Sequence, residues 1–297
     1  MDSTIKTSIE PHRFWTSQAL PLRSARRYTD PVSGIRFYPI TVEDRLLAVP
    51  GVTSLLGALE PPETKQRLEE WRKKEVAAGR DPNAGRNRGT RVHGLLEDLI
   101  RTGRADPQCQ ADADYFSGME RYIEPYEEFL WNERPLVSGW DHCWSAPESD
   151  PDRLARVWSA VWGYAGTPDL IARRRGLTIL GDFKTSTRPY FRCSGDRVPQ
   201  HHEVGYKKYV KTVRQLCAYR LAIQEVLEIP IDGLQIIVGL PEAGKAQQFF
   251  VHGPEMERET ETVKRMAVQF WQRFGQLQQS HGAAAEQAAA RPAAAAT

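Results

Sequence analysis

Two short apolar stretches joined by a two-residue turn constrain the fold of this chain more than any other feature. Residues 167–174 and 177–184 are rich in apolar side chains, the second stretch alternates well, and Arg175 and Gly176 separate them. This spacing predicts a β-hairpin, because two-residue connections containing glycine commonly join antiparallel strands.

Helical and strand patterns on both sides of the hairpin predict an α/β fold. Helices are expected over 64–79, 90–103, 111–132, 206–228 and 256–277, and further strands over 156–166, 233–240 and 246–252. Residues 80–89 have the composition of a turn-rich loop. We expect an N-terminal extension over 1–46, one domain over 47–279, and a disordered alanine-rich tail over 280–297.

The hairpin carries three charged residues that point to metal chemistry. Asp182 and Lys184 project from one face of their strand, and the hairpin brings Asp169 alongside them. Carboxylate oxygens suit Mg²⁺ or Mn²⁺, and such an ion polarises a phosphodiester and lowers the pKa of a bound water. The lysine would orient that water or offset charge in the transition state. Taken alone, Asp-x-Lys is so common that an ordinary surface salt bridge on a hairpin is the better interpretation.

Two helices each carry a polar pair separated by four residues, which places each pair on one helical face. In the first pair, the His93 imidazole is a candidate metal ligand that the Glu97 carboxylate would orient. In the second pair, Gln215 and Tyr219 would bind phosphate oxygens or bases. The alternatives are a partly buried histidine bonded to glutamate, and a tyrosine packed into the core.

Taken together and in this order, these motifs resemble those of a known family. The motifs are GTRVHGLLE (89–97), GYAGTPDLI (163–171), ILGDFKTS (179–186) and QLCAY (215–219). They resemble the RecB-like branch of the PD-(D/E)XK nuclease superfamily, and most of all the single-domain exonucleases related to the mitochondrial genome maintenance exonuclease, with phage and bacterial relatives. The resemblance covers roughly residues 47–240. It implies a restriction-endonuclease-like α-β-β-β-α-β core with extra helices.

The resemblance also implies the roles of the site residues. One or two Mg²⁺ or Mn²⁺ ions would be held by His93, Asp169, Asp182 and the Phe183 carbonyl. Lys184 would be the catalytic lysine, and Glu97, Gln215 and Tyr219 would be auxiliary residues of the site. Some members bind an iron–sulfur cluster through four cysteines, three of them clustered after the core. No cysteine follows Cys217 here, so no iron–sulfur cluster is expected.

The charge balance limits where nucleic acid can bind. The formal net charge is only +2, so a DNA-binding surface must be a local patch. Two basic clusters precede site residues along the chain: Arg86, Arg88 and Arg91, and Lys207, Lys208, Lys211 and Arg214. The neighbouring aromatic residues Tyr190, Phe191, Tyr206 and Tyr209 are candidates for stacking on unpaired bases. Both groups also fit a solvated helix face with aromatic anchors.

The segment 185–204 is longer than a typical connection and is expected to cover the site, which would favour free DNA ends. Its His201–His202 pair lacks helical spacing and is not interpreted as a metal site.

The sequence therefore predicts a metal-dependent deoxyribonuclease, acting as an exonuclease on single-stranded DNA in replication, repair or recombination. The alternatives are an endonuclease of the same fold and a non-cleaving DNA-binding or scaffold subunit. No P-loop is present, so unwinding would require a helicase or another replication or recombination partner. The chain has no targeting segment or membrane-spanning apolar run, which favours a cytoplasmic location in a bacterium or phage-infected host over an organelle.

Overall fold

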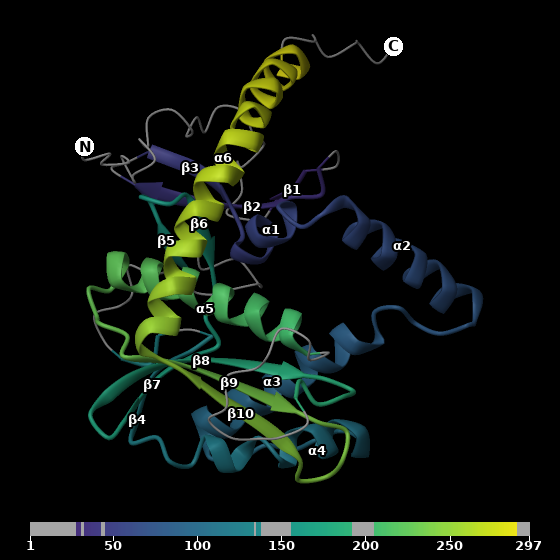
Figure 1. Ribbon diagram of the computed structural model, residues 1–297, viewed down its shortest axis with the longest axis vertical. Helices are drawn as coiled ribbons and strands as arrows, with labels where there is room; N and C mark the ends of the chain where they lie inside the picture. The colour runs from purple at the N-terminus through teal and green to yellow at the C-terminus, as the bar shows by residue number, and fades with distance from the viewer. Residues whose placement is uncertain are drawn as a thin grey trace, which may run out of the picture.

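The computed structural model describes residues 28–30, 33–42, 45–133, 135–137, 156–191 and 205–289. These residues form a mixed α/β fold around a five-stranded sheet with helices on both faces (Figure 1). None of the described helices is long and apolar enough to cross a membrane.

The five-stranded sheet has the order β10-β9-β8-β7-β4. Its strands are β4 (Glu128–Asn132), β7 (Leu170–Arg174), β8 (Leu177–Thr185), β9 (Gly233–Gly239) and β10 (Ala246–Val251). Strand β8 runs parallel to β9, and the other neighbouring pairs are antiparallel. The predicted hairpin is confirmed as β7–β8, and Arg175 and Gly176 turn the chain with φ values of 52° and 75°.

Helices cover the two faces of this sheet with separate cores. Helix α3 (Ala84–Thr102), helix α4 (Gln110–Ser117) and the short η3 (Glu120–Tyr122) lie on one face. Helices α1 (Val52–Ala58), α5 (Tyr206–Val226) and α6 (Gly253–Ala289) lie on the other. Alternation along β7 supplies both cores, because Leu170 and Ala172 pack toward α3 while Ile171 packs toward α5.

Two smaller sheets and one projecting helix complete the described chain. Strands β1 (Tyr28–Thr29), β2 (Arg36–Val42) and β3 (Arg45–Pro50) form one sheet, and β5 (Val157–Ser159) and β6 (Tyr164–Gly166) form the other. Strand β3 spans the boundary expected between residues 46 and 47. Helix α2 (Pro62–Ala77) buries none of its side chains and stands away from the body (Figure 1).

Four expectations from the sequence differ from the structure. The helix expected over 111–132 ends at Ser117, and its last residues form β4, because Leu130 and Trp131 are buried against the sheet. Residues 156–166 form the separate β5–β6 sheet rather than a strand of the main sheet. Helix α3 begins within the expected loop, at Ala84. Helix α6 continues through 280–289, consistent with the high helix propensity of alanine, and 290–297 lie outside the described residues.

Candidate active site

The backbone of Phe183 connects two of the expected metal ligands. Asp169, directly before β7, accepts the Phe183 N–H at its Oδ2 atom over 2.7 Å. The Phe183 carbonyl oxygen in turn lies 2.7 Å from Nε2 of His93 on α3. The Phe183 ring is buried and meets the His93 ring edge-on, with their centroids 6.0 Å apart. Strand β8 therefore fixes both side chains relative to the sheet.

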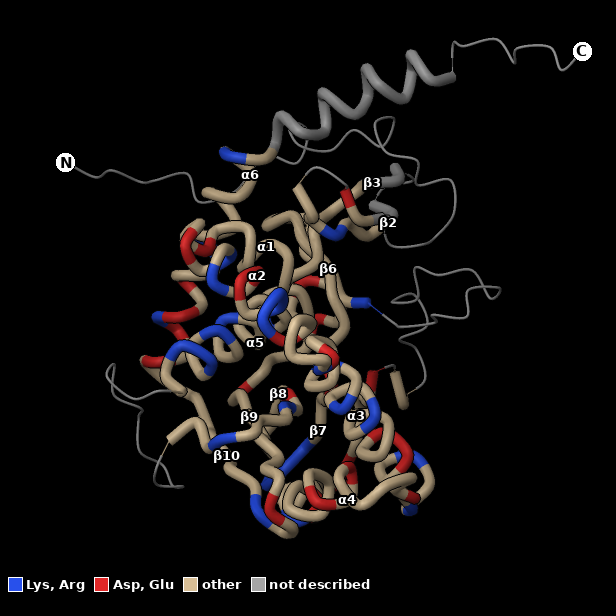
Figure 2. Tube along the Cα trace, turned by 90° about the vertical axis from the view of Figure 1, so that its right-hand side faces the viewer, with Lys and Arg blue, Asp and Glu red and all other residues tan. Residues whose placement is uncertain are grey.

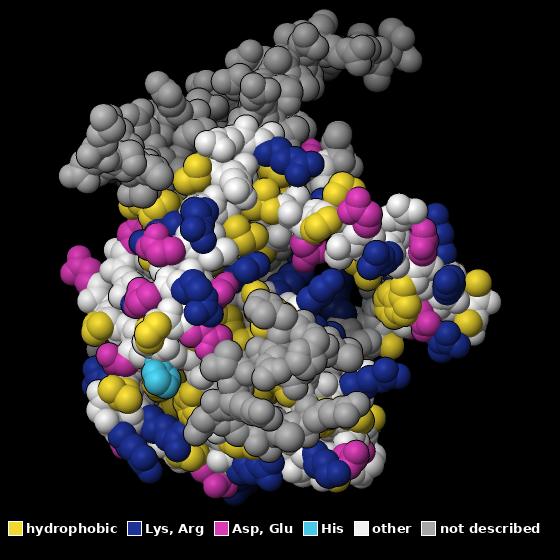
Figure 3. Space-filling model, viewed as in Figure 1, with side chains coloured by type: hydrophobic (Ala, Val, Ile, Leu, Met, Phe, Trp, Pro, Cys, Tyr) yellow, Lys and Arg dark blue, Asp and Glu magenta, His cyan; other side chains and the backbone are white. Residues whose placement is uncertain are grey.

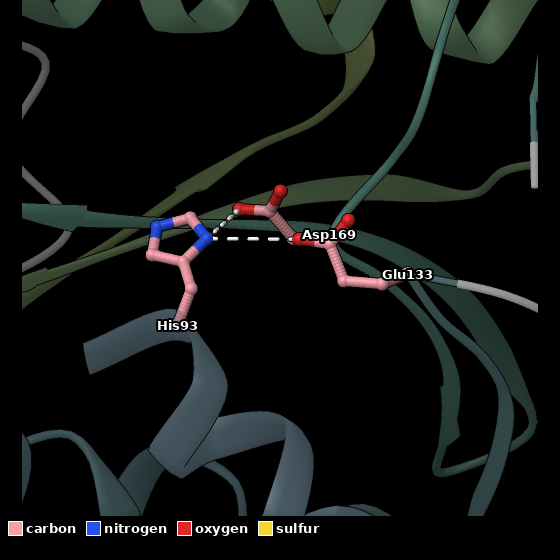
Figure 4. A group of neighbouring side chains, drawn as sticks. All are labelled: His93, Glu133 and Asp169. Atoms are coloured by element: carbon pink, nitrogen blue, oxygen red, sulfur yellow. Dashed lines mark ion pairs between the residues drawn. The ribbon is translucent and has the colours of Figure 1, made fainter. Parts of the chain in front are cut away.

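A carboxylate that the sequence did not reveal completes a group of side chains that could hold a metal ion, here called the metal-binding group. His93 Nδ1 lies 3.6 Å from Asp169 Oδ2 and 3.7 Å from Oε1 of Glu133 (Figure 4). One ligand atom from each residue falls within 4.8 Å of the others. Glu133 follows β4 directly with a φ of 56°, and its N–H donates to the Asp169 carbonyl over 3.1 Å. One imidazole nitrogen and two carboxylates are a donor set that suits a divalent cation.

The electrostatics of His93 agree with this grouping. Burial would lower the pKa of His93, but the Asp169 and Glu133 carboxylates outweigh it and raise the pKa from 6.5 to about 9. Without a metal, His93 is therefore protonated at neutral pH. A carbonyl oxygen can only accept a hydrogen bond, so Nε2 keeps its proton and Nδ1 is the nitrogen available to a metal.

Asp182 and Lys184 form a second charged group, on strand β8. Both project from one face of β8, and the Lys184 ammonium pairs directly with the buried Asp182 carboxylate. Burial and the neighbouring Asp169 raise the pKa of Asp182 to about 6, against the opposing charge of Lys184. Burial alone would lower the pKa of Lys184, but Asp182 and Asp169 raise it above its ordinary value. Lys184 is therefore positively charged, and Asp182 holds its ammonium group in place.

Helix α5 closes the site from the opposite side. Gln215 donates from Nε2 to Asp182 Oδ1 over 3.2 Å, and the same amide nitrogen lies 3.4 Å from the Tyr219 hydroxyl. Burial and the charges of Asp169 and Asp182 hold the pKa of Tyr219 well above its ordinary range, so its hydroxyl stays protonated. Figure 2 shows charged residues of β8 between α3 and α5.

The structure brings most of the sequence-predicted residues together, with two differences from the implied ligand set. Among the described residues, Asp182 lies outside the metal-binding group, and Lys184 and Gln215 engage its carboxylate. The Phe183 carbonyl, a predicted ligand, is already hydrogen-bonded to His93. Glu97 lies one turn after His93 on α3, and its backbone carbonyl accepts a hydrogen bond from Asn132, the residue before Glu133.

Several of the basic residues proposed to bind DNA have partners within the protein. Arg91 pairs with Asp112, Lys211 with Glu60 and Arg214 with Glu259. The Arg88 guanidinium lies over the Tyr115 ring, 4.3 Å from its centroid. Lys208 lies 3.4 Å from the Ser186 hydroxyl, while Arg86 and Lys207 are exposed. Figure 3 shows Lys and Arg side chains around a hollow between α5 and the α2–α3 arm.

The aromatic residues near this surface have a different role from the one predicted. Tyr190, Phe191 and Tyr209 are buried and pack around Phe249. The prediction that these three rings stack on bases is therefore wrong, since each is covered by the core. Tyr206 is half-buried. The His201–His202 pair and residues 192–204 of the expected covering segment lie outside the described residues.

No protein-family model matches this sequence, and no curated protein is significantly similar to it.

Proposed function

We propose that this protein is a divalent-metal-dependent deoxyribonuclease of the PD-(D/E)XK type, which degrades single-stranded DNA from its ends. The observation that carries the proposal is the juxtaposition of two groups at strand β8. The His93–Glu133–Asp169 group suits a metal ion and is tied to β8 through the Phe183 backbone, and the Asp182–Lys184 pair presents a cation from β8 itself. Both groups would assist phosphodiester hydrolysis, because charge develops on the phosphate and water is a weak nucleophile.

The order of elements supports a restriction-endonuclease-like core. Helix α3, strands β4, β7 and β8, helix α5 and strand β9 follow one another in the α-β-β-β-α-β order, with α4 and η3 inserted before β4 and the β5–β6 sheet inserted before β7. The four strands are neighbours in one sheet. The candidate site lies where β7 begins and β8 approaches its end, with α3 and α5 contributing from opposite faces.

The reaction that fits the site is hydrolysis with the 3′ oxygen as leaving group. Bound between His93, Glu133 and Asp169, Mg²⁺ or Mn²⁺ would supply Lewis-acid polarisation and lower the pKa of water. Lys184 would contact the phosphate or the attacking water and offset negative charge, while Asp182 holds its ammonium in place. The water releases a proton to solvent as its oxygen bonds to phosphorus, the bond from phosphorus to the 3′ oxygen breaks, and that oxygen takes up a proton from solvent. The products are a 5′ phosphate and a 3′ hydroxyl.

The auxiliary residues position this machinery. Gln215 orients the Asp182 carboxylate. The Tyr219 hydroxyl lies beside the Gln215 amide and keeps its proton, so it can donate a hydrogen bond. Glu97, one helical turn after His93 on α3, would help to position water, the metal or the DNA backbone. In this proposal the protein serves DNA replication, repair or recombination in the cytoplasm, and a partner helicase supplies any unwinding.

The test is a substrate panel of end-labelled linear single strands, matched duplexes and a circular single strand, each with Mg²⁺, Mn²⁺ or EDTA. We expect shortening of linear single strands alone, dependent on the metal. Cleavage of the circle would instead identify an endonuclease. Metal-independent binding without cleavage of any substrate would identify a scaffold subunit.

A further inference from the structure

Helix α2 exposes an apolar pair that the fold does not use. None of its side chains is buried, and Leu68 and Trp71, one turn apart, are 47% and 46% exposed. The helix stands away from the body as an arm, attached through α1 at one end and α3 at the other (Figure 1). Exposed leucine and tryptophan side chains side by side on such a helix indicate a surface that contacts something else.

The charges around this pair are strongly biased. Six further residues of α2 lie one turn from Leu68 or Trp71 on the helix surface: Thr64, Lys65, Arg67, Arg72, Lys74 and Glu75. Four of the six are basic. The single acid, Glu75, is paired with Arg80 through contacts of 2.7 and 2.8 Å, which lower its pKa. The face therefore combines an indole ring with a surround of positive charge, although the helix as a whole carries acids as well.

The other acids of α2 lie farther round the helix. Glu63, Glu69 and Glu70 are not one turn from either apolar residue, whereas Lys73 is one turn from both Glu69 and Glu70. Arg72 is 3.8 Å from Glu69, but both side chains are more than half exposed, so this contact contributes little. A polyanion with apolar faces complements the Trp71 side of the helix and not the Lys73 side.

Both ends of the arm are joined to elements of the candidate site. Glu60, just before α2, pairs with Lys211 of α5 over 2.6 Å. One turn earlier on α5, Lys208 reaches Ser186, two residues beyond Lys184. The other end of the arm continues into α3, which carries His93. Hydrophobic side chains of the arm border the hollow lined by Lys and Arg in Figure 3.

We propose that α2 is a binding arm for an unpaired nucleic-acid strand, with bases stacked on Trp71 and Leu68 and phosphates on the surrounding Lys65, Arg67, Arg72 and Lys74. Aromatic side chains accept any base, because every base has a π face, whereas bases in a duplex are already stacked on one another. The inference deepens the proposed function, since the arm would hold the strand that the active site shortens. Its surface lies outside the metal-binding group, so binding and cleavage can be measured separately.

The test is the affinity for a fluorescein-labelled oligothymidylate, measured by anisotropy in EDTA to prevent cleavage. Trp71→Ala is expected to weaken binding about tenfold, while Trp71→Phe keeps an aromatic face and should stay within about threefold of wild type. Lys74→Gln should weaken binding and flatten its salt dependence. Lys73→Gln is the matched control, because it removes the same charge from the other face of the same helix. Since α2 buries no side chain, these variants should keep the wild-type melting temperature.

If Trp71→Ala binds the oligonucleotide as tightly as wild type, the proposal that α2 binds the strand is wrong. The nuclease proposal is unaffected by that result as long as wild type cleaves. Loss of affinity in Trp71→Ala, from a wild type that binds but cleaves nothing, would support the arm and contradict the nuclease. Sedimentation could also show wild type as a dimer and Trp71→Ala as a monomer. That result, with DNA binding unchanged, would overturn the proposal and identify a second copy of the chain as the partner of α2.

Discussion

His93 donates a hydrogen bond from Nε2 to the carbonyl oxygen of Phe183 over 2.7 Å, which leaves its Nδ1 atom facing Asp169 and Glu133. Because the same Phe183 holds Asp169 through its N–H, one residue of β8 sets the distance between a nitrogen and an oxygen ligand. The three side chains come from α3 and from the residues next to β4 and β7, and the backbone of β8 holds two of them, which favours a fixed geometry.

The protonation of His93 predicts how the metal-free protein responds to pH. Its folded pKa of about 9 lies above the ordinary value of 6.5. The stability that protonated His93 contributes is therefore fully present below pH 6.5 and is lost as the pH rises through 9. Urea unfolding in EDTA at pH 6.5 and pH 9.5 should show wild type losing on the order of 2 kcal/mol more than His93→Gln. Parallel losses in the two proteins would contradict this assignment.

Glu133 predicts a loss of metal affinity without a loss of fold. Glu133→Gln keeps the size of the side chain but removes one anionic ligand from the group with His93 and Asp169. We expect Mn²⁺ binding, measured by titration calorimetry, to weaken by about tenfold or more. Glu128→Gln is the control, because Glu128 lies on β4, which Glu133 directly follows, but pairs with Arg173 at the surface. Equal weakening in both variants would show that general charge, and not ligation, is responsible.

Gly166 predicts a route for disturbing the site through Tyr219. A Cβ atom at Gly166 would lie 2.6 Å from Cε1 of Tyr219, so Gly166→Ala must displace that ring. Displacement would disturb the amide of Gln215, which holds Asp182. We expect about a tenfold lower cleavage rate with Mn²⁺ affinity within about threefold of wild type.

The control for this substitution is Gly57→Ala on α1, where an added Cβ meets nothing within 4 Å. If Gly166→Ala cleaves as fast as Gly57→Ala, then the positions of Tyr219 and Gln215 do not affect catalysis.

The parts of the fold that the sequence predicts well are those with strong local signals. Arg175 and Gly176 turn the β7–β8 hairpin because both adopt positive φ, and Gly103 ends α3 in the same left-handed region. Within α3, the spacing predicts an apolar stripe of Val92, Leu95, Leu96, Leu99 and Ile100; the first three are buried, and the last two are partly buried against the same core. The residues of the hairpin and of α3 therefore account for His93, Asp169, Asp182 and Lys184 in the candidate site.

The parts that the sequence did not predict depend on tertiary packing. Strand β4 is short and has an irregular register between Phe129 and Trp131, so its local pattern does not distinguish it from a helix. Glu133 was missed for the same reason, because its place in the metal-binding group follows from β4 pairing with β7. An acidic residue directly after the buried Leu130–Asn132 stretch was the available signal.

Metal-dependent cleavage that requires Lys184 is tested most directly by measuring the cleavage rates of wild type and Lys184→Ala on a 5′-labelled linear single strand, in Mn²⁺ and in EDTA. The control is Lys245→Ala, which removes an exposed lysine paired with Glu242. We predict metal-dependent shortening by wild type and the control, at least a hundredfold slower cleavage by Lys184→Ala, and strand binding by that variant in EDTA within about threefold of wild type. Cleavage by Lys184→Ala at the wild-type rate, or cleavage by wild type that persists in EDTA, would contradict the account.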